Sequence, residues 1–185
     1  SHEVNLRTDE YGGSLENRSR LLNEIIDGIR ANCREDFMLG VRLSSERFGI
    51  LLGESKELAQ SLMTSGKVDF LDMSLWDVFK EPQEEEFKGK TLIEHFVELE
   101  RGNTRLGVAG SIRTPQDATR AMEEGVDWVM IGRGAILHHN FPLLYEDNPE
   151  FTPSEIPVTA DYLANEGLSK QFIDYKSNWG FVEKA

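Results

Sequence analysis

The sequence predicts an α/β fold of the (β/α)8 barrel type, represented by about four βα units. Two observations support this prediction. Strand and helix periodicities alternate between residues 14 and 131, and two of the predicted strands end in glycine shortly before a helix. Strands that alternate with helices pair in parallel through right-handed crossovers, so we expect a parallel sheet.

Residues after Ser14 predict the first helix. Ser14 is a suitable N-cap, and Glu16 lies where a negative charge favours the helix dipole. Apolar residues then recur at helical spacing and form one stripe, which comprises Leu21, Leu22, Ile25, Ile26 and Ile29.

The first strand is predicted over residues 37–44, where side chains alternate between two faces. Phe37, Leu39 and Val41 share one face, and Arg42 lies on the other. Arg42 would then point into the barrel interior, where an unpaired charge is costly. It should meet either an electron-rich ligand or a carboxylate elsewhere in the chain.

The remaining elements follow the same alternation. They are a helix over 55–64, a strand over 68–74, a helix over 91–100, a strand over 106–109, a helix that begins at 114–115 and ends at Gly125, and a strand over 127–131. Beyond residue 141 the pattern weakens, apart from a short helix near 169–175. We therefore predict a barrel region over residues 1–145 and a C-terminal extension over 146–185.

Composition restricts the partners of the chain. Its 185 residues suffice for one domain, and its net charge of −13 argues against nucleic acid and anionic membrane surfaces. No apolar run is long enough to span a membrane, and Cys33 is the only cysteine. We expect a cytoplasmic protein, and we interpret the acidic run 81–86 as a solvated loop without a specific role.

Two glycine-containing strand ends predict a phosphate site. Gly110 and Ser111 follow one strand, and Gly132, Arg133 and Gly134 follow the next. In (β/α)8 barrels, the loops after the last two strands frequently bind phosphate, because glycine lets backbone N–H groups approach it and a helix N-terminus adds partial positive charge. The alternative is that these glycines are only turn residues and that Arg133 is a surface ion-pair partner.

The segment Asn5–Arg18 (NLRTDEYGGSLENR) resembles the signature of the old yellow enzyme family, the FMN-dependent NADH:flavin oxidoreductases and ene-reductases. The strand Leu39–Ser44, the turn at Gly110–Ser111 and the sequence Ile131–Arg133 follow in the family's order, so the resemblance covers about residues 5–145. It implies a half-barrel, namely strands five to eight of an FMN-binding barrel.

The resemblance also implies roles for individual residues. Arg42 resembles the arginine at the N1/C2 carbonyl side of the flavin ring, while Gly110, Ser111, Gly132 and Arg133 resemble the residues that bind the FMN phosphate. NADH or NADPH is the implied reductant, and a small molecule such as an activated alkene is the implied acceptor. The signature segment itself is expected to be mostly structural. Ser74 and Trp76 could line the edge of the flavin ring, although Trp76 is more simply interpreted as core.

One departure from the family limits the functional assignment. The family's His-His or His-Asn pair lies upstream of the signature segment, and this sequence begins at Ser1, after that position. We therefore assign no catalytic residue, and we predict no metal site at His138 and His139. Three hypotheses stay open. The first is half of an FMN-dependent oxidoreductase, which acts with a missing N-terminal half or as a homo-oligomer. The others are a non-enzymatic half-barrel that self-associates and a different phosphate-binding barrel enzyme without flavin, in which Arg42 and the signature segment would be coincidences.

Overall fold

The computed structural model describes residues 1–183, which form two compact units. The first unit contains Ser1–Gly110 and Ala121–Met130; the second contains Ser111–Arg120 and the chain from Ile131 onward. The predicted boundary between residues 145 and 146 lies within the second unit and stays a prediction.

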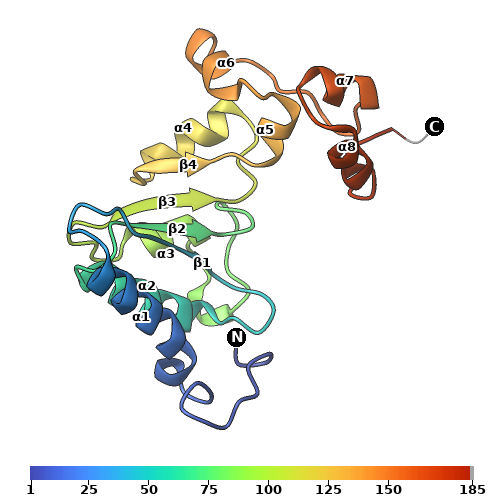
Figure 1. Ribbon diagram of the computed structural model, residues 1–185. Coiled ribbons are helices and arrows are strands. Elements are labelled where there is room, and N and C mark those ends of the chain that lie inside the picture. Colours follow the sequence, from blue (N-terminus) through green and yellow to red (C-terminus); the bar gives the residue numbers. More distant parts are fainter. Residues whose placement is uncertain (184–185) are drawn as a thin grey trace. The chain divides into compact units, whose positions relative to one another are not determined.

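A parallel sheet of four strands forms the centre of the first unit (Figure 1). Its strand order is sequential, and its members are β1 (Gly40–Ser44), β2 (Phe70–Ser74), β3 (Arg105–Ala109) and β4 (Trp128–Met130). This topology confirms the α/β prediction and corresponds to part of a barrel. Strands β1 and β2 begin later than predicted, because the ladder between them starts only where Gly40 lies opposite Phe70, whereas β3 begins one residue earlier than predicted.

The helices of the first unit are α1 (Leu15–Asn32), α2 (Leu52–Thr64) and α3 (Leu92–Val97), with a short 3-10 helix, η1, at Glu85–Phe87. Helix α4 (Pro115–Glu123) begins in the second unit and ends in the first. The second unit adds α5 (Arg133–Leu137), α6 (Phe141–Asp147), α7 (Ala160–Asn165) and α8 (Lys170–Ser177). Helix α8 confirms the predicted C-terminal helix, whereas α5, α6 and α7 are not in the prediction.

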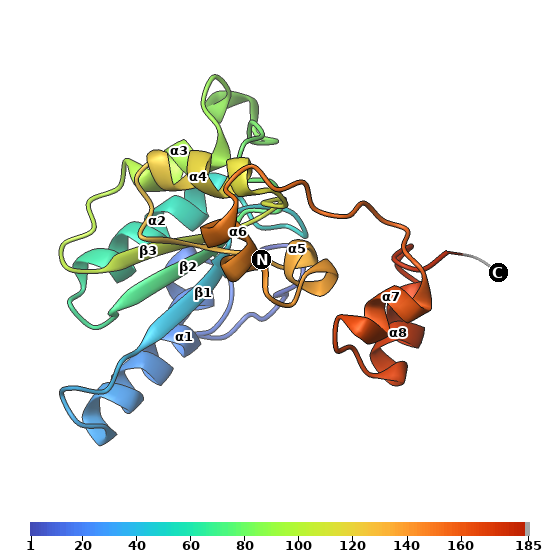
Figure 2. The ribbon, with the colours of Figure 1, turned by 90° about the horizontal axis from the view of Figure 1, so that it is seen from above.

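Apolar side chains on one face of the sheet form the core of the first unit. Helices α2 and α3 lie beside one another along this sheet (Figure 2). Leu71 and Met73 of β2 and Val108 of β3 are completely buried, as are Ala59 of α2 and Phe96 of α3. Burial of this kind contributes roughly 25 cal/mol for each Å² of apolar surface removed from water, so it stabilises the unit.

On the other face of the sheet, aromatic rings lie over glycines of neighbouring strands. A Cβ atom on Gly40 would lie 2.0 Å from the ring of Phe70, and one on Gly107 would lie 2.1 Å from the ring of Trp128. The two rings meet edge to face, with 5.5 Å between their centroids. Both glycines are therefore needed to leave room for an aromatic side chain.

The apolar stripe of α1 is less buried than the sequence suggests. Ile26 is the buried residue of this helix, whereas the side chains of Leu21 and Ile25 are 58% and 51% exposed. The physical reason is that β1 is an edge strand, so part of the stripe has no neighbour in the described chain. An ion pair of Arg18 with Glu54, at 2.5 Å, joins α1 to α2.

The acidic run at residues 81–86 has structural roles that the sequence interpretation missed. Glu84 accepts a hydrogen bond from the backbone N–H of Leu52, the first residue of α2. Glu85 and Glu86 form the start of η1. An acceptor for an unpaired N–H group at a helix start stabilises that helix, so this run is more than a solvated loop.

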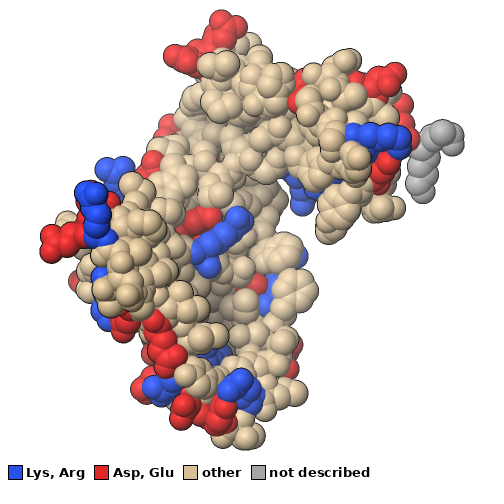
Figure 3. All heavy atoms as spheres, in the orientation of Figure 1, with Lys and Arg blue, Asp and Glu red and all other residues tan. Residues whose placement is uncertain are grey.

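Charged side chains are interspersed over the face drawn in Figure 3, where lysine and arginine lie in small groups among acidic residues. None of the helices within residues 1–183 is long and apolar enough to cross a membrane.

Candidate functional site at the carboxyl ends of the strands

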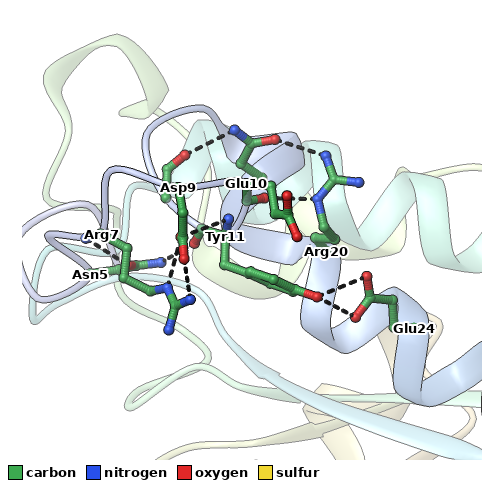
Figure 4. A network of polar contacts seen from close by, with 9 residues as sticks. Asn5, Arg7, Asp9, Glu10, Tyr11, Arg20 and Glu24 are labelled. Carbon is green, nitrogen blue, oxygen red and sulfur yellow. Dashed lines mark hydrogen bonds and ion pairs between the residues drawn. The ribbon is translucent and has the colours of Figure 1, made fainter.

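The signature segment forms a network of polar contacts around Tyr11 (Figure 4). The Asn5 side-chain amide donates to the Tyr11 carbonyl at 2.8 Å, and the Tyr11 N–H donates to Asp9 at 3.1 Å. The Tyr11 hydroxyl donates to Glu24 of α1 at 3.1 Å, and this hydrogen bond raises the pKa of Tyr11. These contacts fix the loop against α1, which agrees with the structural role expected of the segment.

Unusual backbone conformations gather just after the strands. In residues 1–183, four residues other than glycine have a positive φ: Arg47, Phe48, Trp76 and Ser111. All four follow closely on the carboxyl end of β1, β2 or β3. Such conformations cost about 1–3 kcal/mol each and persist where the surrounding structure enforces them, frequently at ligand sites. Carboxyl strand ends are also where parallel α/β folds bind ligands.

Of the two environments that the sequence left open for Arg42, the structure shows the carboxylate, and the role of Arg42 toward a ligand stays a prediction. Its Nε atom lies 3.4 Å from Asp72 Oδ2, across the β1–β2 ladder, and its Nη2 atom donates to Ser74 Oγ at 3.2 Å. The Arg42 side chain is nevertheless 56% exposed. Since a guanidinium has more N–H donors than these two contacts use, Arg42 remains able to bind a ligand.

Asp72 is the buried partner of this pair. Burial raises the pKa of Asp72, and the nearby Arg42 opposes that shift. Its Oδ1 atom is buried without a hydrogen-bond partner. A buried polar atom without a partner is unusual, so this part of the sheet interior is suited to a further donor.

Gly110 has a packing role that the sequence did not reveal. Its φ is +148°, and an added Cβ would lie 2.9 Å from backbone atoms of Trp76 and Asp77. The Gly110 carbonyl also accepts from the N–H of Val78 at 3.2 Å. Glycine is thus required here because the chains that leave β2 and β3 run in contact. A role for Gly110 in phosphate binding stays a prediction.

Gly132 and Arg133 differ from Gly110 in being open to solvent. A Cβ on Gly132 would have no neighbour within 4 Å, so packing does not require glycine at this position. Arg133 is exposed, and none of the ion pairs within residues 1–183 involves it. Gly134, in contrast, is buried, and a Cβ there would lie 2.9 Å from Ile131. Within residues 1–183, Arg133 therefore does not form the surface ion pair that was the alternative interpretation.

Arg133 lines a cavity of about 410 Å³ that lies entirely within the second unit. Its walls come from the segments before α4, around the start of α5, and after α6. They comprise Arg113, Thr114, Arg133, Gly134, Leu137 and residues 152–156. The sequence did not predict the contribution of Arg113 or of residues 152–156, because neither has a recognisable ligand pattern.

The N-terminus of α4 is already occupied by a carboxylate of the same helix. Asp117 Oδ2 accepts from the backbone N–H groups of both Arg113 and Thr114 at 3.0 Å, while the Asp117 N–H donates to Thr114 Oγ1. The partial positive charge expected from this helix is thus partly neutralised. Ser111, Gly132 and Arg133 remain in the second unit as the predicted phosphate binders, while Arg42 and Gly110 belong to the first unit.

Trp76 is not a core residue, contrary to the simpler sequence interpretation. It is 41% exposed and has a φ of +63°. Its ring contacts the guanidinium of Arg47, at 4.5 Å from Cζ to centroid, and the ring of Phe48, at 5.7 Å between centroids. The turn after β2 directs the side chain away from the core because its neighbours Leu75 and Val78 are the buried residues there.

The two adjacent histidines have separate protein partners. His138 Nε2 accepts from the backbone N–H of Ser154 at 2.9 Å, and burial lowers the pKa of His138. The side chain of His139 instead pairs with Glu166 at 2.8 Å. His138 therefore holds the segment that forms one wall of the cavity.

The parallel sheet is part of an α/β barrel with a candidate ligand site at its strand ends, and comparison with known proteins identifies the family. Residues 1–148 match the NADH:flavin oxidoreductase / NADH oxidase family, so the chain belongs to that family, whose cofactor is FMN. This agrees with the resemblance noted in the signature segment.

Individual relatives support the same assignment. An NADH oxidase of Thermoanaerobacter brockii is 32% identical over 151 residues, which cover 77% of this chain and 23% of the relative. A multifunctional alkene reductase/demethylase of Caballeronia cordobensis is 39% identical over 71 residues, or 38% of this chain and 10% of the relative.

A solved structure, the old yellow enzyme homologue from Zymomonas mobilis, shares the fold with a TM-score of 0.65 at 22% identity, covering 90% of this chain and 48% of that one. The chain thus spans less than half the length of these proteins.

Proposed function

We propose that the chain is half of an FMN-binding barrel that transfers hydride from NADH or NADPH, through the flavin, to a small acceptor such as an activated alkene. The main supporting observation is the cavity lined by the exposed Arg133, together with the family to which the chain belongs. The names of the two relatives, an NADH oxidase and an alkene reductase, support the reductant and the class of acceptor.

The residues present fit the FMN phosphate. Arg133 offers a guanidinium without an acidic partner in the described chain, and Gly132 leaves open space where backbone N–H groups are approachable. Ser111 belongs to the same unit and is part of this site in our proposal, whereas the phosphate role of Gly110, in the first unit, stays a prediction. A guanidinium binds phosphate through paired, charge-assisted hydrogen bonds, which makes Arg133 the principal anchor.

The residues around Arg42 fit the polar edge of a flavin ring. When bound, FMN would supply the hydride-transfer chemistry. Arg42 would place a positive charge at the edge of the ring where negative charge accumulates, and Asp72 and Ser74 would hold the guanidinium in place. We assign no catalytic acid or base among the described residues.

The exposed sheet edge and the exposed Leu21 and Ile25 support a further proposal about assembly. Edge strands with unpaired backbone groups and exposed apolar side chains favour association. We propose that the first four strands of a complete barrel, or a second copy of the chain, cover these surfaces. The alternative is a non-enzymatic half-barrel that self-associates, and the same exposed sheet edge supports it.

The test is titration of the purified chain, and of a version extended by the N-terminal half of a family member, with FMN. We expect stoichiometric binding with a visible flavin spectrum in the extended protein, and bleaching of that spectrum by NADH or NADPH under anaerobic conditions. An extended protein that stays colourless would contradict the proposal. Light scattering on the same samples distinguishes a self-associating half-barrel from a monomer.

A further inference from the structure

Three residues beyond β1 and β2 form a surface to which the proposed function above gives no role. Arg47, Phe48 and Trp76 follow the carboxyl ends of these strands, and the side chains of Arg47 and Phe48 both contact the ring of Trp76. We call them the arginine–aromatic patch. All three belong to the first unit, and all three have left-handed backbone conformations. Bulky residues rarely adopt such conformations, which persist only where the surrounding structure enforces them.

The patch is accessible. Phe48 is 71% exposed, Trp76 is 41% exposed, and Arg47 is exposed as well. A protein that buries apolar side chains elsewhere in this unit thus presents two aromatic rings to solvent next to a guanidinium. Exposed aromatic groups combined with arginine are typical of binding sites.

The charge of Arg47 is not neutralised by neighbouring acids. None of the ion pairs formed by residues 1–183 includes Arg47, although the chain has 33 acidic and 20 basic residues. The acids nearest in sequence are engaged elsewhere. Glu46 is buried against Lys80 and accepts from the N–H of Gln83 at 2.9 Å, while Asp77 accepts from the N–H of Phe79 at 3.1 Å. The guanidinium keeps its hydrogen-bond donors for a ligand.

Stacking restricts how that ligand binds. The Arg47 guanidinium lies over the Trp76 ring at 4.5 Å, which orients the planar group and leaves its N–H donors directed outward around its edge. A carboxylate pairs with such an edge through two parallel hydrogen bonds. The neighbouring ring of Phe48 offers apolar area to the rest of the molecule.

From this arrangement we propose that the arginine–aromatic patch binds a planar aromatic carboxylate, with the carboxylate on Arg47 and the ring against Phe48 and Trp76. The inference deepens the proposed function, on which it rests, because it names the class of acceptor for the same end of the sheet. Aromatic acids are expected to bind better than their uncharged amides.

The test uses calorimetric titration of the 185-residue chain with benzoate and, separately, with benzamide, its uncharged analogue. The variant Arg47→Gln removes the charge of the patch. The matched control is Arg105→Gln, which removes an exposed arginine at the amino end of β3, the opposite end of the strands. Circular dichroism confirms that both variants fold.

We expect benzoate to bind more tightly than benzamide by about tenfold or more, since charge-assisted hydrogen bonds exceed neutral ones. Arg47→Gln should weaken benzoate by about 10- to 100-fold and leave benzamide unchanged, and Arg105→Gln should change neither. Equal affinity for the two compounds, no measurable binding, or equal effects of the two variants would overturn the inference.

A parallel FMN titration of the extended protein and of its Arg47→Gln variant separates this inference from the proposed function. If the flavin binds and NADH or NADPH reduces it, while Arg47→Gln leaves the affinity for benzoate unchanged, only the patch assignment is wrong. If benzoate binding depends on Arg47 but no flavin binds, the patch stands as an acid-binding surface and the oxidoreductase proposal fails.

Discussion

Replacing Gly110 by alanine should destabilise the first unit strongly. At a φ of +148°, any side chain imposes backbone strain, and the added Cβ would lie 2.9 Å from backbone atoms of Trp76 and Asp77. The strained conformation costs about 1–3 kcal/mol, and relief of the overlap by backbone movement costs about 1–3 kcal/mol more. Together these predict a loss of about 2–6 kcal/mol, a large share of the roughly 5–15 kcal/mol typical of a domain.

The assay is urea unfolding of the whole chain, followed by far-ultraviolet circular dichroism, with Gly132→Ala as the control. Gly132 has a φ of −93° and open space around its Cα atom, so alanine there should change the free energy of unfolding by less than about 1 kcal/mol. If Gly110→Ala were as mild as the control, the contact between the chains that leave β2 and β3 would be misjudged. An equal loss in both variants would refute the reasoning as well.

Three further predictions concern ion pairing, cofactor binding and pH. Arg18→Ala should lower the free energy of unfolding by about 2–4 kcal/mol, because it removes a side chain that is only 8% exposed and leaves Glu54 without its ion-pair partner. An unchanged urea midpoint would contradict this. In the extended protein, Arg133→Ala should weaken FMN about tenfold or more in fluorescence titration, whereas Arg42→Ala should lower the potential of bound FMN by on the order of 30 mV; equal effects of both on the potential would show misassignment. The pKa of folded His138 lies below its ordinary value of 6.5, so the contribution of His138 to stability is complete above that pH and is lost as the pH falls through the folded pKa. Cleavage by protease at residues 152–156 should therefore increase when the pH is lowered from about 7.5 to about 5.5. The variant His138→Gln should remove that increase.

Local patterns in the sequence were sufficient to predict the four strands and the helices that separate them. Strand alternation around Val41 and capping at Ser14 are signals that depend only on near neighbours. The prediction was less successful where tertiary contacts determine the start of a strand or the burial of a side chain. Phe37 precedes β1 because pairing begins only at Gly40, and Trp76 is exposed because its turn adopts a left-handed conformation.

The candidate site was predictable only in part. Arg42 and Arg133 were identified because they follow the family's order along the chain. The partner of Arg42, Asp72, lies on another strand, and register across a sheet is not readable from one segment. The wall formed by residues 152–156 depends on the hydrogen bond between Ser154 and His138, which joins segments without local periodicity.

The aromatic rings that lie over glycines of neighbouring strands imply that these positions evolve in pairs. Phe70 fills the space that a side chain at position 40 would need, and Trp128 does the same for position 107. A relative with alanine or serine at position 40 should therefore carry a smaller residue at position 70, and the same exchange should link positions 107 and 128. Designed libraries of this barrel should vary each pair together, since single substitutions would be rejected before any effect on chemistry could be selected.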